Sequence, residues 1–220
     1  MFGLKNPLKQ LAGIVCLLIT SLVNGQNDKE AEQLLNAVSD KTASYENISI
    51  SFKYVLSNIS ENIKEQIDGD VIIEGDKYKL NIYGFTRIFD GKTLYTISPE
   101  DEEVTISSEN SEDENTITPS KILSFYKTGY AYQMDITQNV KGKKIQYVKL
   151  IPMDSETEIK SVLLGIKTNT KNIYNLIEVG KNNSNTTLTV TKLVTNQTLA
   201  SDTFKFNKTD YPDYFINNLD

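Results

Sequence analysis

Residue types that commonly do chemistry are scarce in this sequence of 220 residues. It contains no histidine, and Cys16 is its only cysteine. These absences exclude Ser-His and Cys-His nucleophile pairs and the usual zinc ligand sets, so no cofactor and no metal is expected. Paired carboxylates for glycoside hydrolysis stay open, because a chain with 29 Asp and Glu residues offers many pairs and none stands out.

One short motif imitates an enzyme signature. Ser124-Phe-Tyr-Lys127 fits S-x-x-K, and Lys127-Thr-Gly129 fits K-T-G of penicillin-binding enzymes. Both matches use the same lysine, whereas in those enzymes the two motifs lie on separate elements that converge in space. The chain has no S-D-N either. We therefore interpret the motif as the end of an ordinary short helix, and the sequence predicts a binding protein and no enzyme.

The first 25 residues have the layout of a signal peptide. Lys5 and Lys9 give a positive start, and the uncharged apolar run from Leu11 to Val23 follows. The run of roughly 13 residues is shorter than the about 20 that a membrane span needs. Small Gly25 places the expected cleavage before Gln26. An uncleaved anchor and a lipid on Cys16 are the alternatives, and bulky Val15 disfavours the lipid. Export to the periplasm of a bacterium is expected, with a mature chain that lacks disulfides.

The mature chain, residues 26–220, has the length of one domain with a full core. Removing the two leader lysines takes its formal charge from −6 to −8. Such an acidic chain disfavours nucleic acid and anionic membrane surfaces as partners. No linker or solenoid repeat divides it, and a monomer is expected.

An amphipathic helix is predicted to open the mature chain. Asp28 can cap it, and four apolar residues then follow at i, i+3, i+4 and i+7: Ala31, Leu34, Leu35 and Val38. The helix should fade near Ser44. A second, shorter helix is predicted from Pro119 to Gly129, with Ile122, Phe125 and Tyr126 on its apolar face. The acidic stretch Ser108–Thr118 before it is typical of a solvated loop.

Alternation of apolar and polar residues predicts strands through the rest of the chain. Asp90-Gly91 gives a strong hairpin signal between two of them. The expected strands are 48–56, 71–74, 78–83, 86–89, 93–97, 104–107, 130–136, 145–151, 161–168, 173–179, 186–194 and 203–206. Their regular spacing predicts a single meandering sheet, barrel or sandwich.

One face of these strands is predicted to be apolar. Ile48, Ile50, Phe52 and Tyr54 point one way, while Ser49, Ser51 and Lys53 point the other. We expect the same face to continue through Leu80, Ile82, Leu94 and Ile97 and to line an apolar hollow under the two helices. A packed core and a partly unfilled ligand site are both compatible with this pattern.

The order of several short motifs resembles the periplasmic lipoprotein carrier family LolA, in its Bacteroidetes form. The most specific are Phe89-Asp-Gly-Lys-Thr-Leu-Tyr95 and Pro119-Ser-Lys-Ile-Leu123. The resemblance also rests on 31–35, 44–52, 72–80, 126–129, 204–206 and 211–212.

This resemblance implies a fold, a task and partners. The fold would be mainly β with a few helices (α+β): a strongly curved, incomplete antiparallel barrel with a helical lid over an apolar cavity. The task would be to take acylated lipoproteins from an inner-membrane ABC transporter and carry them through the periplasm to the outer membrane, where the acceptor is unknown. The lid residues would be Leu34, Leu35, Val38, Ile122, Phe125 and Tyr126.

One departure from the family pattern and two alternative functions accompany the resemblance. Proteobacterial members carry an Arg-Pro pair after the second strand, where this chain reads Glu74-Gly-Asp-Lys-Tyr78, so the latch of the lid is open. Arg87 is the only arginine that could replace it. A lipid-sensing regulatory module on the same fold is one alternative function, and a glycan-active enzyme or adhesin is a more distant one.

Overall fold

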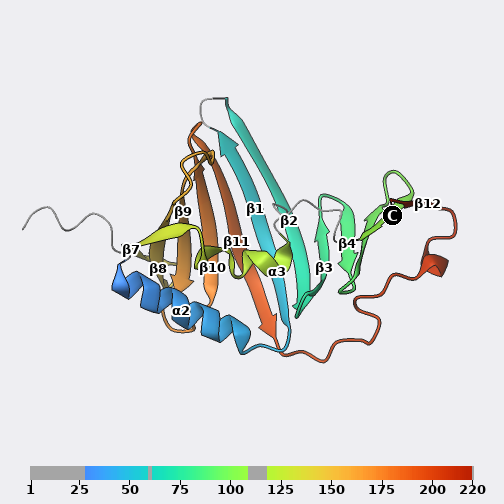
Figure 1. The fold of residues 1–220 in the computed structure, drawn as a ribbon, viewed down its shortest axis with the longest axis horizontal. Coiled ribbons are helices and arrows are strands. Elements are labelled where there is room, and N and C mark those ends of the chain that lie inside the picture. Colours follow the sequence, from blue (N-terminus) through green and yellow to red (C-terminus); the bar gives the residue numbers. More distant parts are fainter. Residues whose placement is uncertain (1–27, 59–60, 109–117, 220) are drawn as a thin grey trace, which may run out of the picture.

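Within the described residues, twelve strands form one sheet, and the helices α2 (Lys29–Ala43) and α3 (Pro119–Ile122) lie on one of its faces (Figure 1). The computed structural model describes residues 28–58, 61–108 and 118–219. The strand order is β12-β6-β5-β4-β3-β2-β1-β11-β10-β9-β8-β7. The bounds are β1 Ile48–Asn58, β2 Ile63–Glu74, β3 Lys77–Ile82, β4 Phe85–Phe89, β5 Thr93–Ser98, β6 Glu103–Ser108, β7 Tyr130–Val140, β8 Lys143–Pro152, β9 Ile159–Lys167, β10 Ile173–Gly180, β11 Ser184–Thr195 and β12 Phe215–Asn218. The helices are α2 Lys29–Ala43, α3 Pro119–Ile122, η2 Phe125–Lys127 and η3 Lys208–Asp210.

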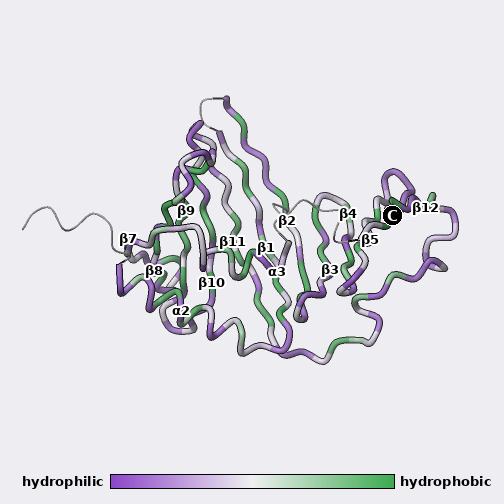
Figure 2. Tube along the Cα trace, viewed as in Figure 1, coloured by the Kyte–Doolittle hydropathy of each residue, from purple (hydrophilic) through white to green (hydrophobic). Residues whose placement is uncertain are grey.

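The sheet is curved and open. Every neighbouring pair is antiparallel except β12, which runs parallel to β6, and the two end strands β7 and β12 are not joined to each other. Long central strands carry apolar residues at alternating positions, whereas the turns are polar (Figure 2). The prediction of a mainly β chain with a curved, incomplete antiparallel sheet is confirmed. No helix of the described residues is long and apolar enough to cross a membrane.

Helix α2 begins and ends where the sequence predicts. The carboxylate of Asp28 accepts hydrogen bonds from the backbone N–H groups of Glu30 and Ala31, at 3.0 and 3.4 Å. The same carboxylate accepts from the backbone N–H of Met134 at 3.1 Å, and the N–H of Asp28 donates to the carbonyl of Tyr132 at 3.1 Å. Asp28 therefore caps α2 and fixes its start to the free edge of β7.

The second helix is shorter than predicted. In place of one helix from Pro119 to Gly129, a four-residue α3 is followed by a turn and then by the 3-10 turn η2. Ser124 has a φ of −137°, which breaks the helix. Aromatic Phe125 and Tyr126 have modest helix propensity, and their packing decides the local backbone. The acidic loop predicted before this segment lies mostly outside the described residues.

The predicted strand at Thr203–Phe206 is wrong. Backbone bonds from Thr203 N–H to Ala200 and from Lys205 N–H to Asp202 make turns there. The alternating pattern has another cause: Phe204 is buried, and Phe206 packs against the cluster of Ile88, Ile97 and Val104. The chain then adds β12, which the sequence analysis missed. This C-terminal strap, residues 196–219, runs from the centre of the sheet to its β6 edge (Figure 1).

Candidate functional site

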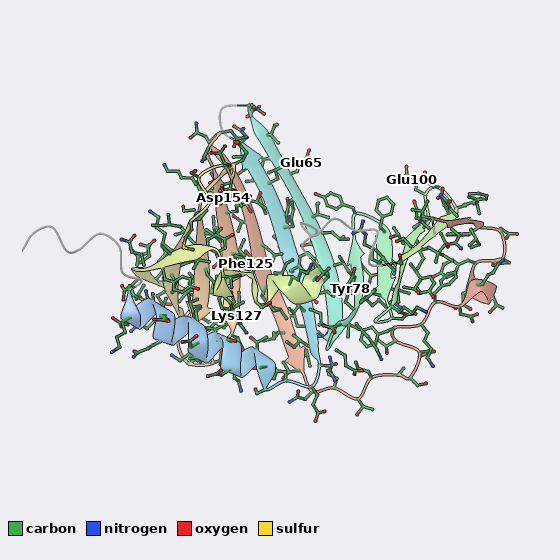
Figure 3. All side chains as sticks on the ribbon, viewed as in Figure 1. Glu65, Tyr78, Glu100, Phe125, Lys127 and Asp154 are labelled. Atoms are coloured by element: carbon green, nitrogen blue, oxygen red, sulfur yellow. The ribbon has the colours of Figure 1, made fainter. Side chains whose placement is uncertain are left out.

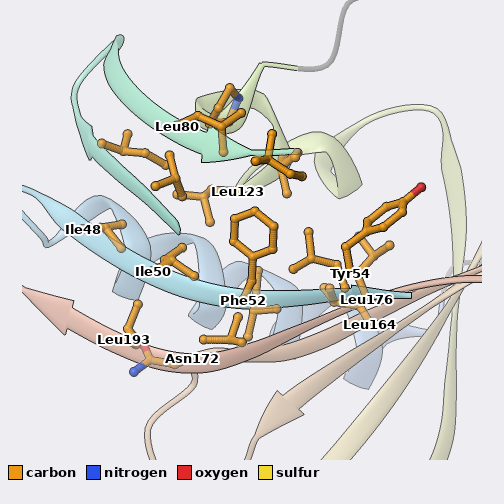
Figure 4. A pocket seen from close by; sticks show the side chains of 18 residues that line it. Ile48, Ile50, Phe52, Tyr54, Leu80, Leu123, Leu164, Asn172, Leu176 and Leu193 are labelled. Carbon is orange, nitrogen blue, oxygen red and sulfur yellow. The ribbon is translucent and has the colours of Figure 1, made fainter. Parts of the chain in front are cut away.

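An apolar pocket of about 240 Å³ lies between the helix-bearing inner face of the sheet and α3 (Figure 4). Its walls contain one amide side chain, Asn172, and one phenol, Tyr54; the others are hydrocarbon side chains. The lining residues are Ile48, Ile50, Phe52, Tyr54, Val71, Ile73, Leu80, Ile82, Pro119, Ile122, Leu123, Leu164, Asn172, Ile173, Leu176, Leu188, Val190 and Leu193.

Strand alternation and one bulge place these side chains on the same face. Ile50 pairs with Leu193 and Phe52 pairs with Val190, with a register shift between them. Without that extra residue in β11, Val190 and Leu193 would point to opposite faces, because they are three positions apart. Thr191 beside the bulge donates its hydroxyl hydrogen to the carbonyl of Ser51 at 2.9 Å.

A glycine makes room for the largest side chain of the pocket. Gly69 on β2 lies directly opposite Phe52 on β1. A Cβ atom at this position would lie 2.5 Å from Cζ of Phe52 and 2.9 Å from the carbonyl oxygen of Asn81. Only the absence of a side chain lets the phenyl ring lie across β2.

Seven of the sequence-predicted site residues line this pocket. Four lie on β1, two lie on β3, and one comes from α3: Ile48, Ile50, Phe52, Tyr54, Leu80, Ile82 and Ile122. The partner strands β2, β10 and β11 supply lining residues that the sequence analysis did not select, such as Val71, Leu176 and Leu188. The alternation of apolar and polar residues in these strands is visible in the sequence. The pairing of β1 with β11, which is far away in the chain, is not.

Helix α2 covers a different part of the inner face. Leu35 and Val38 are buried in a cluster with Tyr126 and with residues of β8 and β9, and Leu34 and Phe125 pack against it. Phe125 stands edge-on to the rings of Tyr126 and Tyr130, each at 5.8 Å between centroids. These five predicted lid residues therefore lie beside the apolar pocket and do not line it.

Leu94 and Ile97 do not share a face, contrary to the expectation. Leu94 pairs with Phe89 and joins the buried cluster around β1 to β3, next to the pocket. Ile97 pairs with Thr86 and is buried with Ile88 and Val104 on the outer face. The two residues are three positions apart on a regular strand, so their side chains must point to opposite sides.

The residues of the short motif that imitates an enzyme signature lie at the end of a helical segment. Ser124 directs its hydroxyl group to the carbonyl of Lys121 at 3.4 Å, and Lys127 ends the same 3-10 turn. Arg87 is exposed on β4, opposite Leu80. Among the described ranges, no three His, Cys, Asp or Glu side chains gather to hold a metal.

Asp28 and Tyr126 are among the titratable groups near the helices whose pKa values are shifted. The hydrogen bond from the Met134 N–H, opposed by desolvation and joined by the helix-capping bonds, lowers the pKa of Asp28. Burial, with the nearby Tyr132, raises the pKa of Tyr126 to about 12. Neither side chain lines the apolar pocket. The pocket can therefore bind a ligand mainly by burying its hydrocarbon groups.

An open curved sheet with an apolar pocket beside a short helix defines a β-rich fold with a site for apolar groups. The sequence assigns it further: the chain belongs to the family described as outer membrane lipoprotein carrier protein LolA, which matches residues 43–207. Among curated protein sequences, none matches the chain significantly.

Solved structures align with this chain at low sequence identity. An uncharacterized conserved protein from Thermus thermophilus aligns with a TM-score of 0.58 and 8% identity, over 86% of this chain and 99% of that one. LprF from Mycobacterium bovis aligns with a TM-score of 0.51 and 15% identity, over 80% and 99%. A LolA superfamily protein from Nitrosomonas europaea aligns with a TM-score of 0.41 and 10% identity, over 80% and 97%.

Proposed function

We propose that this protein carries acylated lipoproteins through the periplasm and holds their acyl chains in the apolar pocket. In this proposal the leader is removed near Gln26, an inner-membrane ABC transporter loads the cargo, and an outer-membrane acceptor receives it. The observation that carries the proposal is the pocket itself: an almost wholly hydrocarbon lining under α3, in a chain of the LolA family.

The energetics of acyl chains suit this task. Each CH₂ group that leaves water contributes about 0.8 kcal/mol, so an unescorted lipoprotein does not cross an aqueous compartment. A carrier must offer comparable burial and yet release the chain at its destination. Side chains that line the pocket but are incompletely covered, including Leu176 and Leu188, supply that burial.

Helix α3 is suited to act as the movable cover. With four residues it is too short to be stable by itself, so it is held by the contacts of Ile122 and Leu123 with the pocket. Elements with few buried contacts open at low free-energy cost. Incoming acyl chains would replace those contacts, and the segment would move without unfolding the sheet.

A matched pair of substitutions on β11 tests the proposal. Leu188 lines the pocket, and its neighbour Thr187 points to the outer face. A carboxylate introduced by Leu188→Glu would meet acyl chains in a site with little water, so affinity for a fluorescent acylated lipopeptide should fall about tenfold or more. Thr187→Glu should change it less than about twofold, within the usual range for surface changes. Circular dichroism checks that both variants fold, and equal affinities would contradict the proposal.

A further inference from the structure

A second cavity adjoins the apolar pocket at one end. It has a volume of about 290 Å³ and shares Ile48, Ile73 and Leu123 with the pocket. We call it the vestibule. It lies between the C-terminal end of α2, the chain leading into β1, and the α3–η2 segment. Its other lining residues are Ser39, Thr42, Ala43, Tyr45, Glu46, Asn47, Gly75, Ser124 and Lys127.

The vestibule is polar where the pocket is not. Lys127 and Glu46 are its two charged side chains, both exposed, and neither forms an ion pair within the described part of the chain. Figure 3 shows Lys127 between α2 and α3. The hydroxyl groups of Thr42 and Ser124 line the same space. The ammonium group of Lys127 thus stands at one end of the apolar pocket, in a lining that also contains the carboxylate of Glu46.

Of the two polar side chains of the pocket, Asn172 lies at this same end and Tyr54 at the other. Asn172 accepts a hydrogen bond from the hydroxyl group of Tyr45 at 2.9 Å, and Tyr45 also lines the vestibule. From Ile48 to Tyr54 the pocket follows β1 for six residues, about 20 Å at the rise of a strand. The site is therefore elongated, and its two ends differ in chemistry.

The opposite end carries no positive charge of its own. It is lined by Tyr54 and Ile82, and the ring of Tyr83 stands edge-on to that of Tyr54 at 6.5 Å. The nearby carboxylates of Asp68 and Asp70 belong to the outer face, where Asp68 pairs with Lys53 at 2.9 Å and Asp70 accepts a hydrogen bond from Asn81 at 2.9 Å. Among the described residues, no lysine or arginine lines this end of the pocket, so an acyl carboxylate would find no cation there.

We propose that an acyl ligand enters the site in one direction, with its carbonyl end in the vestibule and its methyl end beside Tyr54. Lys127 donates a hydrogen bond to the carbonyl oxygen, whether this belongs to a free carboxylate or to an ester. This inference rests on the proposed acyl-binding function and adds to it the polarity of the site and a residue that recognises the head of the ligand.

The absence of tryptophan from the chain allows a direct test of direction. Two single-tryptophan variants are made: Ala43→Trp at the vestibule, where the side chain is exposed, and Tyr54→Trp at the far end. Each is titrated with palmitic acid brominated either beside its carboxyl group or at its terminal carbon. The inference predicts that bromine at the terminal carbon quenches the indole fluorescence of the Tyr54→Trp variant more strongly. Bromine beside the carboxyl group should quench the Ala43→Trp variant more strongly.

The reverse order, or equal quenching of both variants by each ligand, would overturn the fixed direction while leaving acyl binding established. Absence of binding by either brominated acid, measured by displacement of a fluorescent fatty acid, would instead overturn the acyl-binding function itself. The two failures are therefore distinguishable.

A second arm tests Lys127 and the source of the carbonyl oxygen. Lys127→Gln should weaken binding of palmitic acid about tenfold and of its methyl ester about threefold, because the hydrogen bond to a charged acceptor is the stronger one. Lys64→Gln, on exposed β2 away from both cavities, is the charge-matched control and should change neither. Unchanged affinity of Lys127→Gln for both ligands would remove Lys127 from the site.

Discussion

Gly69 is the residue on which the shape of the pocket depends most directly. Its missing side chain lets the ring of Phe52 cross β2. Gly69→Ala should therefore displace that ring and lower the free energy of unfolding by about 1–3 kcal/mol, the usual cost of overpacking. In a Phe52→Leu background the same change should cost less, with a coupling of about 1 kcal/mol. Urea unfolding of the four proteins measures the cycle, and strictly additive costs would contradict the steric explanation.

Tyr126 and Tyr132 both lie under α2, and their hydroxyl groups differ in hydrogen bonding. Tyr126 is 1% exposed, and its hydroxyl group has no hydrogen-bond partner among the described residues. The hydroxyl group of Tyr132 donates to the carbonyl oxygens of Tyr126 and Lys127, at 2.8 and 3.1 Å.

Removing these two hydroxyl groups should have opposite effects. Tyr126→Phe removes a buried polar atom without a partner among the described residues and should be neutral or stabilising by up to about 1 kcal/mol. Tyr132→Phe removes donated hydrogen bonds and should destabilise by about 0.5–1.5 kcal/mol. Thermal unfolding measures both, and a Tyr126→Phe variant less stable than Tyr132→Phe would show that the Tyr126 hydroxyl group has a partner.

At the scale of elements, the capped start of α2 should respond to acid. The hydrogen bonds of Asp28, led by the one from Met134, hold its pKa below the ordinary value of 3.8. A carboxylate with a lowered folded pKa stabilises the fold above the unfolded pKa, and this stabilisation is lost as the pH falls through the folded pKa. The attachment of α2 to β7 should therefore be constant from neutral pH down to about 4 and weaken below that.

Hydrogen exchange of the Met134 amide reports this attachment. Asp28→Asn should keep the helix cap, since Asn is a good capping residue. However, one oxygen of the carboxylate becomes an NH₂ group, and it cannot accept from the Met134 N–H. That amide should exchange faster in the variant at neutral pH and lose the acid dependence seen in the wild type. Equal protection in both proteins would show that Asp28 does not hold the helix.

Much of the element structure could be predicted from local patterns. The alternation of Ile48, Ile50 and Phe52 predicted β1, and Asp28 predicted the start of α2. The errors have physical causes. Leu94 and Ile97 were expected on one face, although side chains three positions apart on the same strand point to opposite faces. The aromatic alternation at Phe204 and Phe206 imitates a strand, while tertiary packing and turn hydrogen bonds decide otherwise. Pairing of β1 with β11, which completes the pocket, joins segments far apart in the chain and leaves no local signal.

At the scale of the whole molecule, the C-terminal strap covers the outer face of the sheet at strands β4 to β6. The ring of Phe206 stacks on Tyr95 at 4.9 Å and on Tyr211 at 5.5 Å, and the strap packs against the buried cluster of Ile88, Ile97 and Val104. The strap and the pocket thus lie on opposite faces of the sheet, the strap over β4 to β6 and the pocket over strands that include β1, β3 and β11.

This separation predicts that stability and binding can be changed independently. Tyr211→Ala removes a half-buried ring from the stack and should lower the free energy of unfolding by roughly 2 kcal/mol, below the cost for a fully buried aromatic ring. The melting temperature should fall by about 4–8 °C. Affinity for an acylated lipopeptide below the transition should stay unchanged. A loss of binding with the fold intact would show that the strap acts on the pocket.

The central claim is that the inner-face pocket carries the acyl chains of lipoproteins. Native mass spectrometry of the protein isolated from the cells that produce it tests this most directly, with the Leu188→Glu variant isolated in parallel. If the pocket holds acyl chains, we expect a wild-type species heavier by the mass of acylated lipoprotein cargo, released intact on collisional activation, and a strong depletion of that species in the variant. Wild-type protein without cargo, or equal cargo on both proteins, would contradict it.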